Sequence, residues 1–269
     1  MASGGVSPLT SVSPVPSLQG STNPSVSSPL AQTSNSSSTA PPRTKICVFC
    51  GSSPGLSPAH MAMARSLAQH MASQNISLVY GGGTVGLMGE IARTLVSLAG
   101  PTSVHGIIPA PLVKYERGPD SDAIAEHSRE NGSGAPENGS GLPEYTVYGK
   151  TTVVKDMHTR KSMMAQEVLA GGPGSGFIAL SGGYGTLEEL MEVVTWNQLG
   201  IHNRGVVVLN VEGYWDGLMS WIKNSVAAGF VGEGNKGIVV DAKTAEEAVK
   251  ALREYKLTVG RFKLEWGNE

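Results

Sequence analysis

Short apolar runs alternate along most of the chain with longer segments in which apolar residues recur at helical spacing. The runs are KICVFC (45–50), ISLVY (76–80), SVHGII (103–108), GFIAL (176–180), GVVVLNV (205–211) and GIVV (237–240). The helical segments cover 58–73, 86–99, 155–170, 185–199, 215–228 and 244–255. Short buried strands that alternate with helices indicate a parallel sheet covered on both faces. The pattern therefore predicts a single α/β domain with three layers, built on a Rossmann-like, doubly wound parallel sheet.

Three regions lack this pattern. Residues 1–42 are rich in Ser, Pro, Thr, Asn and Gly and contain no Lys or Arg. Such a segment buries too little apolar surface to offset the entropy of ordering, so we expect a disordered tail and neither a transit peptide nor a usual signal peptide. Residues 118–141 predict a low-complexity insert. The domain is expected over 43–258, followed by a C-terminal tail over 259–269.

Composition and charge exclude several classes of function. The chain has 269 residues and a net charge of −2, with no basic field that would favour nucleic acid. No apolar run approaches the roughly 20 residues needed to span a bilayer. The two cysteines, Cys47 and Cys50, lie in a predicted strand, where residues three apart face opposite sides. We interpret them as core residues of a cytoplasmic protein rather than as a redox pair or zinc site.

Two predicted strands are followed by glycine-rich turns that open a helix, GGGTVGLMGE (81–90) and SGGYGTLEEL (181–190). Glycines let a ligand approach the backbone closely, and a helix start offers unpaired N–H groups and partial positive charge. Such a turn is a phosphate seat, or else only a tight turn with close packing. Thr186 can add a hydroxyl or cap the helix. Neither turn fits a P-loop or the dinucleotide fingerprint, so we expect a phosphate ligand without an ordinary dinucleotide.

Charged residues stand close to the second turn and at the start of another helix. Glu188 and Glu189 fall in a first helical turn, where acidic residues also simply complement the helix dipole. The apolar positions around them predict that one glutamate faces the mouth of the loop. Arg160 and Lys161 lie near the start of the 155–170 helix, where an anion should compensate them. That anion is Asp156, in a surface ion pair four residues apart, or a ligand.

The stretches YGGGTVGLMG, DMHTRK and SGGYGTLEE resemble the LOG ("Lonely Guy") family of cytokinin riboside 5′-monophosphate phosphoribohydrolases. CVFCGSSPG and WNQLGIH are similar to the same family, and the resemblance covers about residues 45–255 apart from the insert. It implies hydrolysis of the N-glycosidic bond of an N6-modified AMP, or of AMP itself, to the free base and ribose 5-phosphate. It also implies no cofactor and no metal, a nucleoside monophosphate as ligand, and a homodimer with sites near the subunit interface.

The resemblance assigns roles to individual residues. It implies that Arg160 and Glu189 are catalytic. It implies a nucleotide pocket formed by Gly82, Gly83, Glu116, Arg160, Lys161, Gly182, Gly183, Tyr184, Gly185, Thr186, Leu187, Glu188 and Thr195. Ser181 stands where the family motif has proline, which would restrict the chain at the start of the loop. The alternative hypothesis is a non-catalytic carrier of a nucleotide or of molybdopterin on the same fold.

Overall fold

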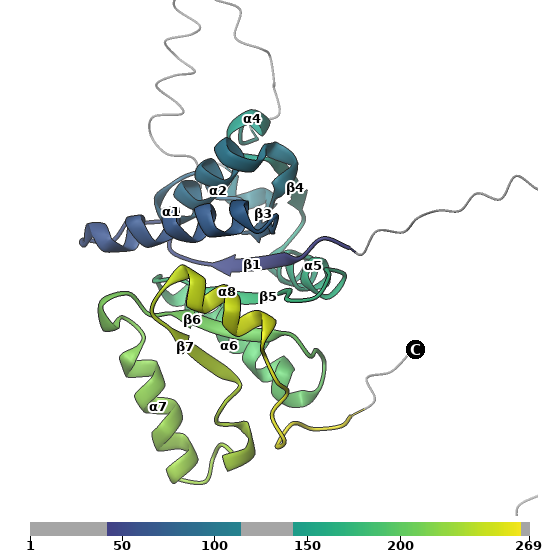
Figure 1. Ribbon diagram of the computed structural model, residues 1–269. Coiled ribbons are helices and arrows are strands. Elements are labelled where there is room, and N and C mark those ends of the chain that lie inside the picture. Colours follow the sequence, from purple (N-terminus) through teal and green to yellow (C-terminus); the bar gives the residue numbers. More distant parts are fainter. Residues whose placement is uncertain (1–41, 114–141, 265–269) are drawn as a thin grey trace, which may run out of the picture. The chain divides into compact units, whose positions relative to one another are not determined.

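The computed structural model describes residues 42–113 and 142–264, which form a parallel sheet with helices on both sides (Figure 1). The strands are β1 (Lys45–Phe49), β2 (Ser77–Tyr80), β3 (Val104–Pro109), β4 (Lys150–Val154), β5 (Gly176–Ala179), β6 (Gly205–Leu209) and β7 (Val239–Ala242). The helices are α1 (Pro58–Ser73), α2 (Gly86–Ala99), α4 (Tyr145–Tyr148), α5 (Met157–Leu169), α6 (Tyr184–Leu199), α7 (Asp216–Ala227) and α8 (Ala245–Arg253). The predicted α/β class is confirmed.

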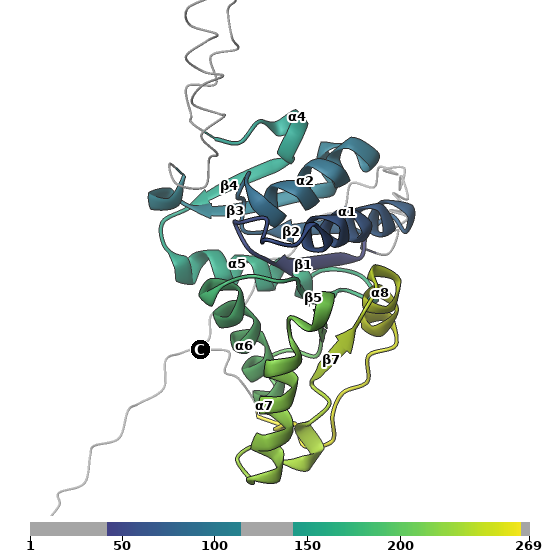
Figure 2. The same ribbon diagram turned by 90° about the vertical axis from the view of Figure 1, so that its left-hand side faces the viewer.

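The helices divide into two layers. One apolar core packs α1, α2 and α8 against one face of the sheet, and a second core packs α5, α6 and α7 against the other face (Figure 2). Cys50 belongs to the first core and Cys47 to the second, and both are buried. The prediction that these cysteines are core residues on opposite faces is therefore confirmed.

The sheet has seven strands in the order β4-β3-β2-β1-β5-β6-β7, and all six neighbouring pairs are parallel. The order of the strands reverses at β1, which pairs with β2 on one side and with β5 on the other. In open α/β sheets, ligands bind beyond the carboxyl ends of the strands at such a reversal. The topology therefore directs attention to the loops that follow β1 and β5.

Two elements were not predicted, and they adjoin each other in the chain. Strand β4, with the sequence KTTVV, lies at the edge of the sheet and buries only its last residue, so it carries no apolar run. Helix α4 has four residues, which is too short for a periodic pattern. The expected insert at 118–141 and almost all of the expected tail at 1–42 lie outside the described residues.

The described part of the expected C-terminal tail lies against the domain. Arg261 donates hydrogen bonds to the carbonyl oxygens of Asn197, Gly200 and His202, and the N–H of Phe262 donates to Gln198. These contacts attach the chain end to the last turn of α6. None of the helices in 42–113 and 142–264 has both the length and the apolar character required to cross a membrane.

Candidate functional site

A pocket of about 380 Å³ opens at the carboxyl ends of β1 and β5, where the strand order reverses. It is lined by Gly51, Ser52, Ser53, Gly55, His60, Leu87, Ser181, Gly182, Gly183 and Tyr214. The loop after β1, His60 and Tyr214 were missed by the sequence reasoning. The signal that could have found the first of them is the rule on strand reversal, applied to the stretch GSS that follows β1.

The second glycine loop, Ser181–Gly185, leads into α6 and leaves its backbone accessible. Gly183 is the N-cap of α6, and no side chain caps this helix start. A Cβ atom built on Gly183 or Gly185 would meet nothing within 4 Å. The first turn of α6 therefore keeps N–H groups and positive dipole charge in reach of a ligand. This geometry fits the expected phosphate seat.

Thr186 supports this loop from inside the first turn of α6. It is buried, and its hydroxyl lies so close to Gly182 that a Cβ on that glycine would stand 2.1 Å from the Thr186 oxygen. The glycine at position 182 is thus required for packing. Because Gly183 is the N-cap, Thr186 does not occupy the capping position. A contact between its hydroxyl and a phosphate stays a prediction.

Side chains from two other elements hold the start of the second glycine loop. Ser181 is buried, and its Oγ lies 3.0 Å from Nδ1 of His60 in α1. The Tyr214 hydroxyl donates to the Gly182 carbonyl, and the Tyr214 ring stands edge-on to His60. The N–H of Gly51 donates to the Ser181 carbonyl at 3.0 Å. At the position where the family motif has proline, the loop is therefore restrained by hydrogen bonds.

Arg160 of α5 and Glu189 of α6 form a buried ion pair. Arg160 Nη2 lies 3.7 Å from Glu189 Oε1, and their side chains are 8% and 10% exposed. The side chain of the neighbouring Glu188 is 54% exposed. Of the two glutamates, Glu189 is thus the buried one, and the expectation that one of them faces the mouth of the loop stays a prediction. Asp156 is the N-cap of α5 and accepts a 2.7 Å hydrogen bond from the N–H of Thr159.

The first glycine loop, Gly81–Val85, packs against this arginine. A Cβ on Gly81 would stand 1.9 Å from Arg160 Nη2, so any larger residue would displace the guanidinium. Gly82 has φ +78° and would bring a Cβ within 3.1 Å of Ile108 on β3. These glycines have packing reasons of their own, and contacts of Gly82 and Gly83 with a nucleotide stay predictions.

Lys161 connects α5 to α6 next to the ion pair. Its Nζ lies 2.5 Å from Glu188 Oε1 and 2.5 Å from Glu192 Oε2. Burial lowers the pKa of Lys161, but the hydrogen bonds with these two glutamates outweigh it and raise the pKa above its usual value. The ammonium group therefore links the two helices that carry Arg160 and Glu189. Its predicted contact with substrate stays a prediction.

The charges of the buried ion pair affect the pKa of Cys47 on β1. Burial raises the pKa of its thiol well above the usual value, the charge of Glu189 raises it further, and Arg160 lowers it. A thiol of this kind stays protonated and is a poor nucleophile. Within 42–113 and 142–264, no group of three or more His, Cys, Asp or Glu side chains is placed to hold a metal ion.

Among the predicted site residues that the structure describes, only Gly182 and Gly183 line the 380 Å³ pocket, and four predicted residues remain to be located. Tyr184 is 96% exposed at the start of α6, and Leu187 is also exposed. Thr195 is exposed further along α6, and its hydroxyl donates to the Met191 carbonyl of the same helix. Glu116 lies outside the described residues. The roles of these four residues stay predictions.

Comparison with known proteins identifies the family. Residues 88–252 match the model of a family described as "Possible lysine decarboxylase". A cytokinin riboside 5′-monophosphate phosphoribohydrolase of Arabidopsis thaliana is 42% identical over 211 residues, which are 78% of this chain and 82% of that protein. A bifunctional cytokinin biosynthesis protein of Fusarium pseudograminearum is 52% identical over 221 residues, 82% of this chain. The chain spans only 42% of the length of that fungal protein.

Solved structures add a likeness in fold. The Moco carrier protein of Chlamydomonas reinhardtii superposes with a TM-score of 0.50 at 16% identity, over 79% of this chain and 96% of that one. At this identity the match supports the three-layer α/β fold alone. The sequence matches define more: this protein belongs to the LOG family, to which the description "Possible lysine decarboxylase" is also attached.

Proposed function

We propose that this protein hydrolyses the N-glycosidic bond of cytokinin riboside 5′-monophosphates and releases the free base and ribose 5-phosphate. The observation that carries the proposal is the buried Arg160–Glu189 pair, whose glutamate belongs to the same helix, α6, that begins at the open second glycine loop. The relative from Arabidopsis thaliana is named for this activity. The topology, the position of the pocket and the uncapped start of α6 fit a small anionic substrate.

Helix α6 joins the two halves of the proposed site. Gly183 at its start lines the pocket, and Glu189 follows six residues later, about 9 Å along the helix axis at 1.5 Å per residue. A 5′-phosphate held by the N–H groups of the first turn would extend its ribose along this direction. The phosphate seat explains why the nucleotide, and not the nucleoside, is the proposed substrate.

Glu189 has the central chemical role in this proposal. Cleavage of a C–N glycosidic bond builds positive charge on the sugar ring, which a nearby carboxylate stabilises. The same carboxylate can accept a proton from the attacking water. The water needs room on the face of the sugar opposite the leaving base, by analogy with O-glycosidases. These steps need neither a metal nor a redox cofactor.

Arg160 balances the charge of Glu189 and can also stabilise the departing base or hold the phosphate. Its guanidinium offsets the cost of burying a carboxylate, because an unpaired charge in this position would be strongly destabilising. The Arg160 guanidinium packs against Gly81, and the backbone of this arginine belongs to α5. The place where the substrate binds decides whether Arg160 stabilises the base, holds the phosphate or orients Glu189.

We also propose a cytoplasmic homodimer whose interface lies near the site. Three exposed apolar side chains, Met157, Tyr184 and Leu187, come from the helix starts that carry the ion pair. Exposed apolar side chains on helices next to the proposed site favour an interface there. Light scattering on the purified chain should give twice the mass of one chain, and a mass of one chain would contradict the dimer.

The activity is tested with isopentenyladenosine monophosphate and with AMP, and free base is measured by chromatography. The parent should release base, and Glu189→Gln should lower kcat by about 10²- to 10⁴-fold, the range of general acid–base catalysis. Glu246→Gln, at an exposed glutamate in the first turn of α8 and outside the proposed site, is the control and should keep the parent activity. A folded Glu189→Gln variant as fast as the parent would contradict the mechanism.

The alternative is a carrier that binds a nucleotide or molybdopterin without turning it over. It would bind the nucleotide tightly and return it intact after long incubation. The likeness to the Moco carrier protein supports only the shared fold, so hydrolysis is the better supported function. Comparison of the two substrates also decides whether AMP or an N6-modified nucleotide is preferred.

A further inference from the structure

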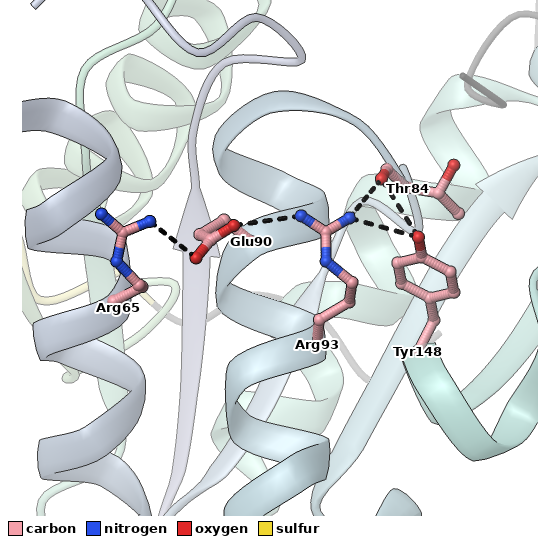
Figure 3. Close-up of polar contacts among 5 residues, drawn as sticks. All are labelled: Arg65, Thr84, Glu90, Arg93 and Tyr148. Atoms are coloured by element: carbon pink, nitrogen blue, oxygen red, sulfur yellow. Dashed lines mark hydrogen bonds and ion pairs between the residues drawn. The ribbon is translucent and has the colours of Figure 1, made fainter. Parts of the chain in front are cut away.

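A chain of polar contacts connects α1, α2 and α4 on the face of the sheet opposite α5 and α6 (Figure 3). Glu90 of α2 lies between two arginines, with Oε1 2.9 Å from Arg65 Nη1 and Oε2 3.0 Å from Arg93 Nη2. Arg93 Nη1 also donates to the Tyr148 hydroxyl of α4 at 3.2 Å and to the Thr84 carbonyl at 3.2 Å. Arg93 is thus the member that reaches the first glycine loop.

Glu90 is charged in this network. Burial raises the pKa of its carboxyl, but hydrogen bonds with Arg65 and Arg93 outweigh burial and hold the pKa below its usual value. A charged acceptor makes the contact with Arg93 directional and fixes one half of the guanidinium fork. The other terminal nitrogen of Arg93, Nη1, then donates to the Thr84 carbonyl.

The Thr84 carbonyl is tightly enclosed at the end of the loop. A Cβ on Gly89 would stand 2.0 Å from the Thr84 oxygen and 3.2 Å from Arg93 Nη1. The Tyr148 hydroxyl also approaches that oxygen at 3.4 Å. Val85, the N-cap of α2, makes no side-chain capping bond. Arg93 and Tyr148 therefore both donate hydrogen bonds to the Thr84 carbonyl, at the point where the loop joins the helix.

The same loop backs the buried ion pair at its other end. Gly81, three residues before Thr84, leaves the space that Arg160 Nη2 occupies. The space between Gly81 and the Arg160 guanidinium is too small for a methyl group. A shift of the loop toward Arg160 would therefore displace the guanidinium. The loop thus contacts Arg160 at Gly81 and Arg93 at Thr84.

We infer that Arg93 and Tyr148 are positioning residues for the proposed hydrolysis. They hold the first glycine loop through the Thr84 carbonyl, and the loop holds Arg160 opposite Glu189. Neither residue needs to touch substrate. The inference rests on the proposed function for its effect on rate, while its effect on geometry stands without that function.

The chain offers a matched control for this role. Arg65 and Arg93 each form one ion pair with Glu90, and Arg93 also donates to the Thr84 carbonyl. Arg65→Gln and Arg93→Gln each remove one ion pair with Glu90, and Arg93→Gln also removes the contacts with Thr84 and Tyr148. A role confined to stability predicts a lower Tm for Arg93→Gln but the same kcat, at a temperature where both variants are folded.

The experiment measures kcat, KM and Tm for the parent, Arg65→Gln, Arg93→Gln and Tyr148→Phe. Arg93→Gln should lower kcat about tenfold with little change in KM, because a displaced catalytic group loses orientation. Tyr148→Phe should lower kcat about threefold by the same reasoning, since it removes one donor near Thr84. Arg65→Gln should stay within about twofold of the parent in kcat, because it leaves that orientation intact. Equal kcat values for Arg65→Gln and Arg93→Gln would overturn the inference.

A crystal structure of Arg93→Gln separates this inference from the proposed function. The distance from Arg160 Nη2 to Glu189 Oε1 should exceed the 3.7 Å of the parent. An unchanged ion pair and an unchanged Gly81–Val85 loop would overturn the positioning role. If the parent itself releases no base, the proposed function fails, and the geometry of this variant still decides whether Arg93 positions Arg160.

Discussion

The two glycine loops lie at the same edge of one sheet and share the order strand, glycines, helix, but they use their glycines differently. In the first loop, protein atoms fill the space beside Gly81 and Gly86, where a Cβ would meet Arg160 at 1.9 Å or the Ser52 backbone at 2.4 Å. In the second loop, Gly183 and Gly185 face open space. Glycine thus permits close packing in the first loop, whereas in the second loop only Gly182 is packed and Gly183 and Gly185 leave the backbone accessible.

The two loops therefore have different roles, although their sequences share the same order of strand, glycines and helix. The first loop shapes the protein around Arg160, and the second leaves helix-start N–H groups available to an anion. Substitutions in the first loop should therefore act on catalytic geometry. Substitutions at the open positions of the second should act on binding, without a cost in folding.

The largest expected effect in this comparison comes from Gly81→Ala. The new methyl would overlap Arg160 Nη2, the end of a long side chain that can move without unfolding the core. We expect kcat to fall about 100-fold, since misplacement of a catalytic group by about 1 Å costs that much. Tm should change by only a few degrees. Steady-state kinetics and thermal unfolding check this, and a parent-like kcat in a folded protein would contradict the role of the first loop.

Gly183→Ala should have the next largest effect. Position 183 has φ −92°, which alanine adopts readily, and nothing lies within 4 Å of the new Cβ. The fold should therefore keep its stability, while the methyl occupies space next to the proposed phosphate. We expect KM to rise about tenfold with kcat nearly unchanged, a loss of about 1.4 kcal/mol in binding. If KM does not change, the phosphate lies elsewhere.

Ser181→Pro should have the smallest effect and sharpens the account of the second loop. Proline fixes φ by its ring, whereas Ser181 is restrained through its 3.0 Å contact with His60. Ser181→Ala removes that contact and should raise KM about threefold, consistent with about 0.5–1.5 kcal/mol for one hydrogen bond. Ser181→Pro should recover a KM at or below that of the parent.

A double variant tests whether His60 acts through Ser181. In the Ser181→Pro background, His60→Ala should leave KM unchanged, because proline has no hydroxyl for the imidazole to hold. In the parent background the same substitution should raise KM as much as Ser181→Ala does. Additive effects of His60→Ala in both backgrounds would show that His60 meets the ligand directly.

Much of the fold follows from periodicity in the sequence. The helix predicted at 86–99 has those bounds in the structure, and the one predicted at 185–199 begins one residue earlier, at Tyr184. Strand β4 was missed because an edge strand with exposed threonines lacks the apolar run of a buried strand. The apolar positions of α6 predicted that one of Glu188 and Glu189 faces the loop, but they did not predict that Glu189 is the buried one.

The rest of the candidate site depends on contacts between distant parts of the chain. No local pattern shows that Gly81 abuts Arg160, or that His60 reaches Ser181 across 121 positions. Arg93 was not singled out, because an arginine on a helix is usually a solvated surface residue. Its role follows only from the enclosed carbonyl of Thr84, which sequence reasoning cannot place.

The account depends on the proposed arrangement of phosphate and carboxylate along α6. A crystal structure of Glu189→Gln with isopentenyladenosine monophosphate tests it most directly, because the slow variant should retain the substrate. We predict the phosphate within hydrogen-bonding distance of the N–H groups at residues 183–186, and the anomeric carbon of the ribose next to the substituted side chain at position 189. A phosphate bound away from this helix start, or a ribose remote from position 189, would contradict the proposed mechanism.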